Sequence, residues 1–412
     1  MTPLIALAIA LAQLAPAADA QKADPAALER LARDILRQVE EMRGQKLTRP
    51  MKMGVKSKPE VTAFIRERLD DEYGPAKVEA EGRMLKLMGL VPEPLDYGKF
   101  IISLMTEQVA GFYDHTRQEL HIASWLPTLM QAPVMAHEIF HAIQDQEWGG
   151  GKLIDSKTYS HDRVLAHAAL LEGDATVVMF DWQQLQAGNP MDFATSAFMV
   201  NLIATSLPMQ MASPEFPVMA VAPDYFKQSL IFPYQQGLLF VAALRQGGLD
   251  WAAVRKVYDD PPESTEQILH PERYFRERDR PSTVELPKPL VAGFNRPWDG
   301  VAGEFHARQI LMTALPIGDA IAGAAGWDGD YTVLETKGEQ AVAVSRSTWD
   351  TPADADQWAA ALRRVDEKRP APKPTLAIVH EGTEVAAAWS TDAALARSTA
   401  QAAFERAKVE RR

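Results

Sequence analysis

Two histidines and a glutamate lie close together near the middle of the chain. Residues 137–141 read His-Glu-Ile-Phe-His. On a predicted helix with 3.6 residues per turn, His137 and His141 lie one turn apart on the same face, so their imidazoles can bind one metal ion. Glu138 lies about 100° further round the helix, where its carboxylate can accept a proton from a metal-activated water molecule. These residue types at this spacing predict a metal centre with its own general base.

Glu172 is the best candidate for the third protein ligand that a catalytic zinc site commonly needs. It lies on a second predicted helix, on the same face as a row of apolar side chains. A carboxylate in an apolar row is costly to bury unless it is paired or binds a metal. The neighbouring Gly173 has no side chain, so another helix can approach closely. The apolar row consists of Leu165, Ala168, Ala175 and Met179.

These four polar positions resemble the gluzincin class of zinc metallopeptidases, which combine His-Glu-x-x-His on one helix with a downstream Glu on another. The resemblance covers roughly residues 109–176. It implies that His137, His141 and Glu172 hold Zn²⁺ and that Glu138 is the general base for hydrolysis of peptide bonds. Residues 108–114 and 264–274 are also similar to segments of little-characterised exported bacterial proteins of predicted peptidase type.

One position departs from the gluzincin pattern. Many gluzincins have an acidic residue three or four positions after the ligand glutamate, where it orients a metal-bound histidine. Ala175 and Thr176 occupy those positions here. Asp174 is only two positions away and points about 200° from Glu172 on a regular helix. We therefore expect Thr176, or a group elsewhere in the chain, to orient a ligand.

A peptidase of this class also needs a side chain that stabilises the charge developing on the substrate. The candidates are His270, Tyr234 and Tyr274, among which the sequence does not choose. His115 and His121 flank the turn of a predicted hairpin, and we expect both on the surface of its strands.

Three predicted elements position the metal centre. Aromatic and β-branched residues on either side of a polar turn predict a β-hairpin between residues 108 and 123. Pro133 is expected to open the helix that carries the two histidines, and glycines end it after Trp148. Ser160 is expected to cap the long helix that carries Glu172. An edge strand directly before the metal-binding helix suits a gluzincin, because it can align an extended substrate.

The N-terminus has the pattern of a secretory signal. The run from Leu4 to Leu14 is apolar except for Gln13, and small residues precede a cleavage site expected after Ala20. No other apolar run reaches about 18 residues, so we expect no membrane span once residues 1–20 are removed. The sequence thus predicts a periplasmic or secreted protein.

Composition narrows the possible functions further. The chain has 412 residues, a net charge of −12 and no cysteine. The acidic charge argues against general nucleic-acid binding, because phosphate contacts need clustered Lys and Arg. The absence of cysteine excludes disulfide scaffolds, iron–sulfur clusters and thiolate zinc fingers.

Periodicity and proline content divide the remaining chain. Residues 21–91 form a predicted N-terminal helical region, which could be a pro-segment, with an amphipathic helix over 25–43 and a basic loop over 46–58. Residues 92–285 contain the zincin-like core. A proline cluster between Arg280 and Arg296 precedes a small α+β unit over 297–412, in which residues 326–330 are expected to form a tight turn. The predicted fold class is therefore α+β and mainly helical.

A second function competes with peptide hydrolysis. The C-terminal unit carries no evident catalytic set, although it makes up more than a quarter of the chain. The protein could therefore be a zinc-containing pseudoenzyme or a cell-envelope binding or assembly module, with the C-terminal unit contacting an envelope protein.

Overall fold

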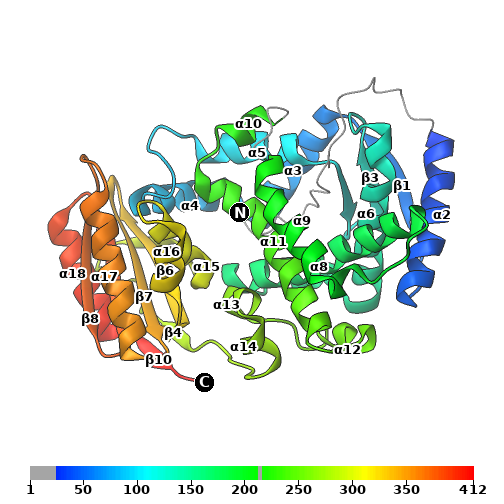
Figure 1. Cartoon of the computed structure of the whole chain (residues 1–412). Helices are drawn as coiled ribbons and strands as arrows, with labels where there is room; N and C mark the ends of the chain where they lie inside the picture. Colours follow the sequence, from blue (N-terminus) through cyan, green and yellow to red (C-terminus); the bar gives the residue numbers. More distant parts are fainter. Residues whose placement is uncertain (1–24, 212–215) are drawn as a thin grey trace.

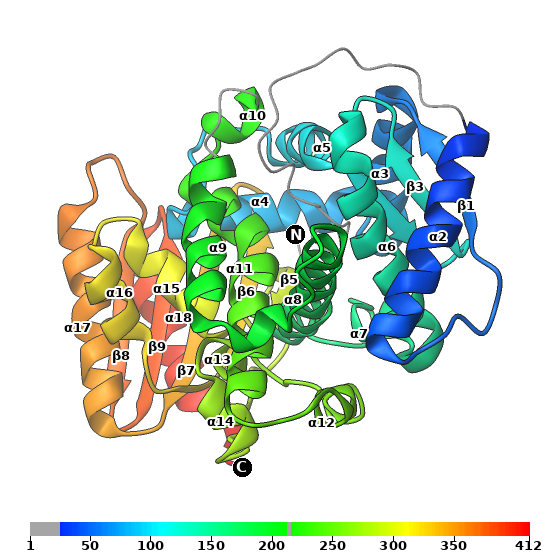
Figure 2. The same ribbon diagram turned by 45° about the vertical axis from the view of Figure 1, so that its right-hand side comes forward.

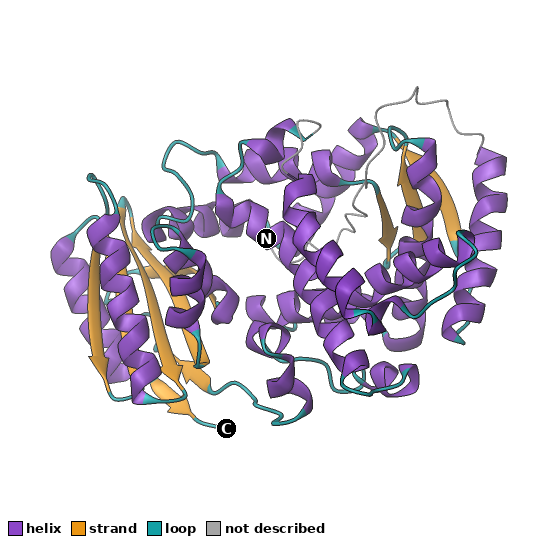
Figure 3. Cartoon of the chain, in the orientation of Figure 1, coloured by secondary structure: helices purple, strands orange, loops and turns teal. Residues whose placement is uncertain are grey.

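The computed structural model describes residues 25–211 and 216–412 and is mixed α and β, mainly helical, which confirms the predicted fold class. A small sheet and helix α2 lie at one end of the molecule, and a larger sheet lies at the other (Figures 1, 2 and 3). The predicted signal segment, residues 1–20, lies outside the described residues. Within them, none of the helices is both long enough and apolar enough to cross a membrane.

The N-terminal region is helical as predicted, but its basic segment is more than a loop. Residues Lys52–Lys56 form strand β1, which pairs in parallel with β3. The strand lies at a sheet edge and exposes Lys52 and Val55, so its side chains lack a clear alternation of buried and exposed positions. The helices are α2 (Pro25–Arg43), α3 (Lys58–Glu72), α4 (Pro75–Met88) and α5 (Tyr97–Gln108).

The predicted β-hairpin is present. Strands β2 (Gly111–Asp114) and β3 (Glu119–Ala123) pair antiparallel, and the order β1-β3-β2 leaves β2 at the edge. Apolar side chains of α2 and of this sheet share one cluster with the helix that carries the two histidines. That helix is therefore held from behind by α2 and from one side by the hairpin.

The histidine-bearing helix α6 (Thr128–Trp148) begins earlier than predicted, so Pro133 lies inside it. The proline is in the second turn, where only the carbonyl of Leu129, a residue with an exposed side chain at the start of the helix, loses its partner. Gly149 ends the helix in the left-handed conformation, with φ of 70°.

Helix α8 (His161–Gln186) carries Glu172 and begins as predicted, because the Ser160 side chain accepts a hydrogen bond from the N–H of Arg163. It packs against α6 and against α11. The remaining helices of this part are α7 (Gly150–Leu153), η1 (Phe193–Thr195), α9 (Ala197–Met211), α10 (Pro217–Ala220), α11 (Asp224–Gln246), α12 (Trp251–Lys256), α13 (Thr265–Leu269) and α14 (Pro271–Phe275).

Gly173 permits the close helix approach that the sequence suggested, and its partner is α11. A Cβ atom at Gly173 would lie 2.1 Å from the carbonyl carbon of Gly237, and one at Gly237 would lie 2.0 Å from the carbonyl oxygen of Ala169. Both distances are far below van der Waals contact, so the two helices cross through glycine.

The C-terminal part is built on a sheet with the strand order β5-β6-β7-β9-β8. The strands of the C-terminal part are β4 (Thr283–Glu285), β5 (Asn295–Gly300), β6 (Trp327–Lys337), β7 (Gln340–Trp349), β8 (Thr375–Glu381), β9 (Glu384–Ser390) and β10 (Lys408–Glu410). Its helices are α15 (Gly303–Met312), α16 (Ile317–Ala324), α17 (Pro352–Lys368) and α18 (Ala393–Arg406).

The expected turn over residues 326–330 is wrong, because β6 already begins at Trp327. The polar residues that suggested a turn are satisfied inside the fold. The carboxylate of Asp330 accepts hydrogen bonds from the backbone N–H groups of Ala302 and Gly303 and from the indole of Trp327. One apolar cluster continues from α4 and α5 into this sheet and includes Trp327, so the C-terminal unit is fastened to the N-terminal helices.

Candidate metal centre

The structure brings the three predicted ligands together. The Nε2 atom of His137 lies 3.0 Å from Oε2 of Glu172 and 3.0 Å from Nε2 of His141. The third separation, between Nε2 of His141 and Oε2 of Glu172, is 3.2 Å. His137 and Glu172 are buried, and 13% of the His141 side chain is exposed. Three ligand atoms from α6 and α8 thus converge on one point.

This set of donors fits a zinc ion. Imidazole nitrogen and carboxylate oxygen are common zinc ligands, and at about 2.0–2.2 Å from a tetrahedral ion they lie at least about 3.3 Å apart. The observed separations of 3.0 to 3.2 Å are close to that value. Two imidazoles and one carboxylate therefore face one another at a spacing that suits a shared metal ion.

The charges of the three side chains also favour a cation. Burial raises the pKa of Glu172, but His141 and the hydrogen bonds from both histidines outweigh burial and lower it to about 2. Burial lowers the pKa of His141, but Glu172 outweighs that effect and raises it to about 9. Burial lowers the pKa of His137, against the effect of Glu172. The carboxylate of Glu172 is therefore ionised and attracts positive charge.

Glu138, which the sequence predicts to be the general base, lines a cavity with two of the ligands. Its side chain is fully buried, and neither carboxylate oxygen has a hydrogen-bond partner within the described residues. Burial raises the pKa of Glu138 well above its usual value, although His141 opposes the shift. The carboxylate lines a cavity of about 40 Å³ together with His141 and Glu172. Such a volume holds about one to three water molecules.

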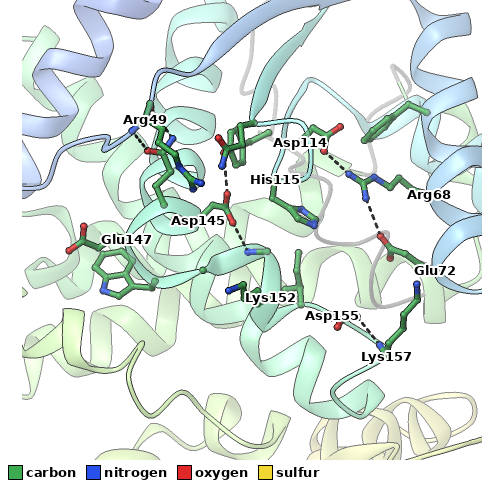
Figure 4. A pocket seen from close by; sticks show the side chains of 18 residues that line it. Arg49, Arg68, Glu72, Asp114, His115, Asp145, Glu147, Lys152, Asp155 and Lys157 are labelled. Atoms are coloured by element: carbon green, nitrogen blue, oxygen red, sulfur yellow. Dashed lines mark hydrogen bonds and ion pairs between the residues drawn. The ribbon is translucent and has the colours of Figure 1, made fainter.

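A wider cleft of about 810 Å³ adjoins this cavity. The cavity and the cleft share lining residues from β2, the hairpin turn, α6 and the segment that follows α6. These residues are Tyr113, His115, Asp145, Gly151 and Ile154. Figure 4 shows His115 near the centre of the cleft, with charged side chains of both signs around it. The cavity beside the ligands therefore borders on the cleft.

His115 does not lie on an open strand surface as predicted. It is half-buried in the turn of the hairpin and lines both the cavity and the cleft. Its ring lies against Gly151, where an added Cβ would be 2.4 Å from Cδ2 of the imidazole. Burial lowers the pKa of His115. The sequence offered no signal for this position, because the contact joins the hairpin turn to the short helix α7.

Gln144 is a residue of the centre that sequence reasoning missed. Its Oε1 atom lies 2.6 Å from Nδ1 of His141, on the opposite side of the ring from the ligand atom. Gln144 follows His141 by three positions, so the helical spacing on α6 could have identified it. It takes the orienting role that we expected of Thr176 or of a group elsewhere in the chain.

Of the three candidates for stabilising charge on a substrate, only Tyr234 lies beside the ligands. Its ring centroid is 6.3 Å from that of His137, and the two planes are tilted by 28°. His270 instead pairs with Glu304 of α15 at 3.1 Å. The hydroxyl of Tyr274 donates to the carbonyl of Asp260 at 2.8 Å.

A second group of carboxylates does not form a comparable site. Glu266, Asp279 and Asp350 face one another, but the guanidinium of Arg273 lies among them. Its Nη1 atom is 3.1 Å from Glu266 and 2.6 Å from each aspartate. The cation that this group needs is therefore supplied by the chain itself.

Comparison with known proteins yields one match. Residues 290–408 match a family described as a domain of unknown function (DUF8575). None of the curated proteins and none of the solved structures compared matches the chain. The matched segment covers the C-terminal unit, so His137, Glu138, His141 and Glu172 all lie outside it.

Proposed function

We propose that the protein is a zinc-dependent metallopeptidase that hydrolyses peptide bonds. One observation carries the proposal: three ligand atoms converge beside a buried carboxylate that lines the same cavity. In this proposal His137, His141 and Glu172 hold Zn²⁺, and Glu138 is the general base. We place the enzyme in the periplasm or outside the cell, on the strength of the N-terminal pattern.

A zinc ion held by these side chains would polarise the scissile carbonyl and lower the pKa of a water molecule. Glu138 takes a proton from that water and then donates it to the leaving amine nitrogen. Glu138 lines the cavity beside the ligands, so its carboxylate can reach a water molecule there. In this proposal Tyr234, whose ring lies beside that of His137, would contact the reacting carbonyl.

Strand β2 is suited to aligning an extended peptide. The N–H of Ala123 donates to the carbonyl of Ala110 at 2.9 Å, so these two residues form a hydrogen-bonded pair. Such pairs alternate along an antiparallel ladder, and therefore Gly111 and Tyr113 direct their backbone groups away from β3. Tyr113 also lines the cavity beside Glu138. A substrate strand could add to this edge with its scissile bond close to the ligands.

The competing function, a zinc-containing pseudoenzyme or envelope-assembly module, has one observation in its favour. The cavity at the ligands is about 40 Å³, which admits water but no peptide group with its neighbours. Hydrolysis therefore requires the cavity to widen toward the cleft. In a pseudoenzyme it would stay closed, the metal would be structural, and the C-terminal unit would bind an envelope protein.

Substitution of Glu138 tests the proposal. The chain without its predicted signal is purified as wild type and as Glu138→Gln, and zinc content and cleavage of a peptide library are measured. We expect about one zinc per chain in both, and cleavage slowed at least about 100-fold in the variant. Asp181→Asn is the matched control, because Asp181 is a buried carboxylate that lines neither cavity.

The two functions predict different results in this assay. Cleavage at the wild-type rate by Glu138→Gln, with zinc still bound, would refute the mechanism. A wild-type protein that binds zinc and cleaves no library peptide would instead support the pseudoenzyme.

A further inference from the structure

We propose that a chain of buried hydrogen bonds, running from Arg43 in the N-terminal helix, orients the metal ligand His141. It passes through Asp174, Tyr258 and Gln144, which act as positioning residues. This inference rests on the proposed zinc site, because it concerns how firmly that site binds metal.

The side-chain amide of Gln144 can face in only one direction. Its Nε2 group donates to the carbonyl of Leu171 at 2.9 Å, and a carbonyl can only accept. Oε1 therefore faces the His141 ring and accepts a hydrogen bond from its Nδ1–H, over 2.6 Å. A ring protonated on Nδ1 presents the lone pair of Nε2 to a metal. Gln144 thus selects the tautomer of His141 that can be a ligand.

Tyr258 links the side-chain amide of Gln144 to Asp174 on helix α8. Its hydroxyl accepts a hydrogen bond from Nε2 of Gln144 at 2.8 Å and donates one to Oδ2 of Asp174, also at 2.8 Å. The ring stacks on Trp148, with centroids 4.1 Å apart and planes 8° from parallel. Stacking fixes where the hydroxyl lies, so each of its two hydrogen bonds supports the other.

Asp174 and Arg43 form the far end of the chain. Nη2 of Arg43 lies 2.6 Å from Oδ1 of Asp174, and the two side chains are only 2% and 1% exposed. The guanidinium also lies over the rings of Phe140 and Trp251, at 4.8 and 3.7 Å from their centroids. A buried carboxylate needs such a partner, since an unpaired charge here would be very costly. Arg43 therefore keeps Asp174 available as an acceptor for Tyr258.

This arrangement gives α2 a part in the metal centre. Arg43 is the last residue of α2, and apolar side chains of the same helix pack against α6. A pro-segment that is removed on activation would leave Asp174 buried without its cation. We therefore infer that α2 remains in the active protein.

Removal of one hydroxyl tests the chain of hydrogen bonds. Tyr258→Phe keeps the ring that stacks on Trp148 and removes both hydrogen bonds. Tyr274→Phe is the matched control, because it removes a tyrosine hydroxyl that donates to the carbonyl of Asp260, and Tyr274 lines neither cavity. Zinc affinity is measured by competition with a chelator, and the visible spectrum is recorded after substitution with Co²⁺. We expect zinc to bind at least about 10-fold more weakly to Tyr258→Phe, with a shifted cobalt spectrum.

The outcomes separate this inference from the proposed function. If the wild-type chain binds no zinc, the proposed zinc site itself is refuted. A Tyr258→Phe protein with the affinity and spectrum of wild type and of Tyr274→Phe overturns the orienting chain and leaves the zinc site standing. Arg43→Gln tests the far end, and its circular dichroism shows whether it folds. Weaker zinc binding by folded Arg43→Gln supports a role for α2, whereas unchanged binding overturns it.

Discussion

Replacing Gly173 by alanine is expected to force apart helix α8, which carries Glu172, and helix α11, which carries Tyr234. A Cβ atom at this position would lie 2.1, 2.2 and 2.7 Å from backbone atoms of Gly237 on α11. Backbone cannot rotate away as the end of a flexible side chain can. The helices must therefore separate by about 1.5 Å before ordinary van der Waals contact is restored.

Two opposing effects determine the size of the change. Alanine favours a helix over glycine by about 1 kcal/mol, and overpacking a close contact costs about 1–3 kcal/mol or more. Here both helices are buried along the crossing, so we expect the clash to dominate and the free energy of unfolding to fall by about 2 kcal/mol. Glu172 precedes Gly173, and Tyr234 lies on α11. Their displacement should weaken zinc binding at least about 10-fold.

The assay compares Gly173→Ala with Gly318→Ala. Gly318 lies in helix α16 with no other atom within 4 Å of an added Cβ, so that variant should gain about 0.4–1 kcal/mol. Urea unfolding and zinc competition are measured on both variants and on wild type. If Gly173→Ala were as stable as Gly318→Ala, the close crossing of α8 and α11 would be refuted.

Two further predictions concern the metal and the pH. Removal of zinc by a chelator should destabilise the wild type by about 4 kcal/mol, relative to protein in free zinc at about 1,000 times the Kd. The chelator should leave the stability of Glu172→Ala unchanged, and thermal unfolding measures both proteins. Burial raises the pKa of Asp181 to about 7, against hydrogen bonding from the N–H of Phe193 at 2.7 Å. The folded state then binds the proton more tightly than the unfolded state, so stability falls as pH rises from about 4 to about 7. Asp181→Asn keeps the hydrogen bond and should be up to about 4 kcal/mol more stable than wild type at pH 8, with no gain at pH 4, when unfolded by urea.

Local patterns predicted the elements that carry the ligands. Apolar residues spaced three and four positions apart predicted α2. Ser160 predicted the start of α8, and Gly149 predicted the end of α6. The errors were also local. The strand Lys52–Lys56 was missed because it lies at an exposed edge and its side chains show little alternation of buried and exposed positions. Asp330 suggested a turn in its own segment, but its carboxylate finds hydrogen-bond partners at the start of α15.

The ligands were predictable because each has a reason visible in its own segment. His137 and His141 share a helix face by spacing alone, and Glu172 interrupts an apolar row. Gln144 had the same kind of signal, at three positions after His141. By contrast, His115 reaches the cavity through its contact with Gly151, a residue in a separate segment of the chain.

The residues behind the ligands could not be found in this way, because their pairing depends on distant segments. Arg43 and Asp174 are 131 positions apart, and Tyr258 lies 84 positions from Asp174. On α8 taken alone, Asp174 points away from Glu172, and this argued against a role at the metal. The fold reverses that conclusion, since Tyr258 and Gln144 carry the interaction from Asp174 round to the far side of the His141 ring. A residue that faces away from a ligand can therefore still orient the site, provided that buried partners connect the two.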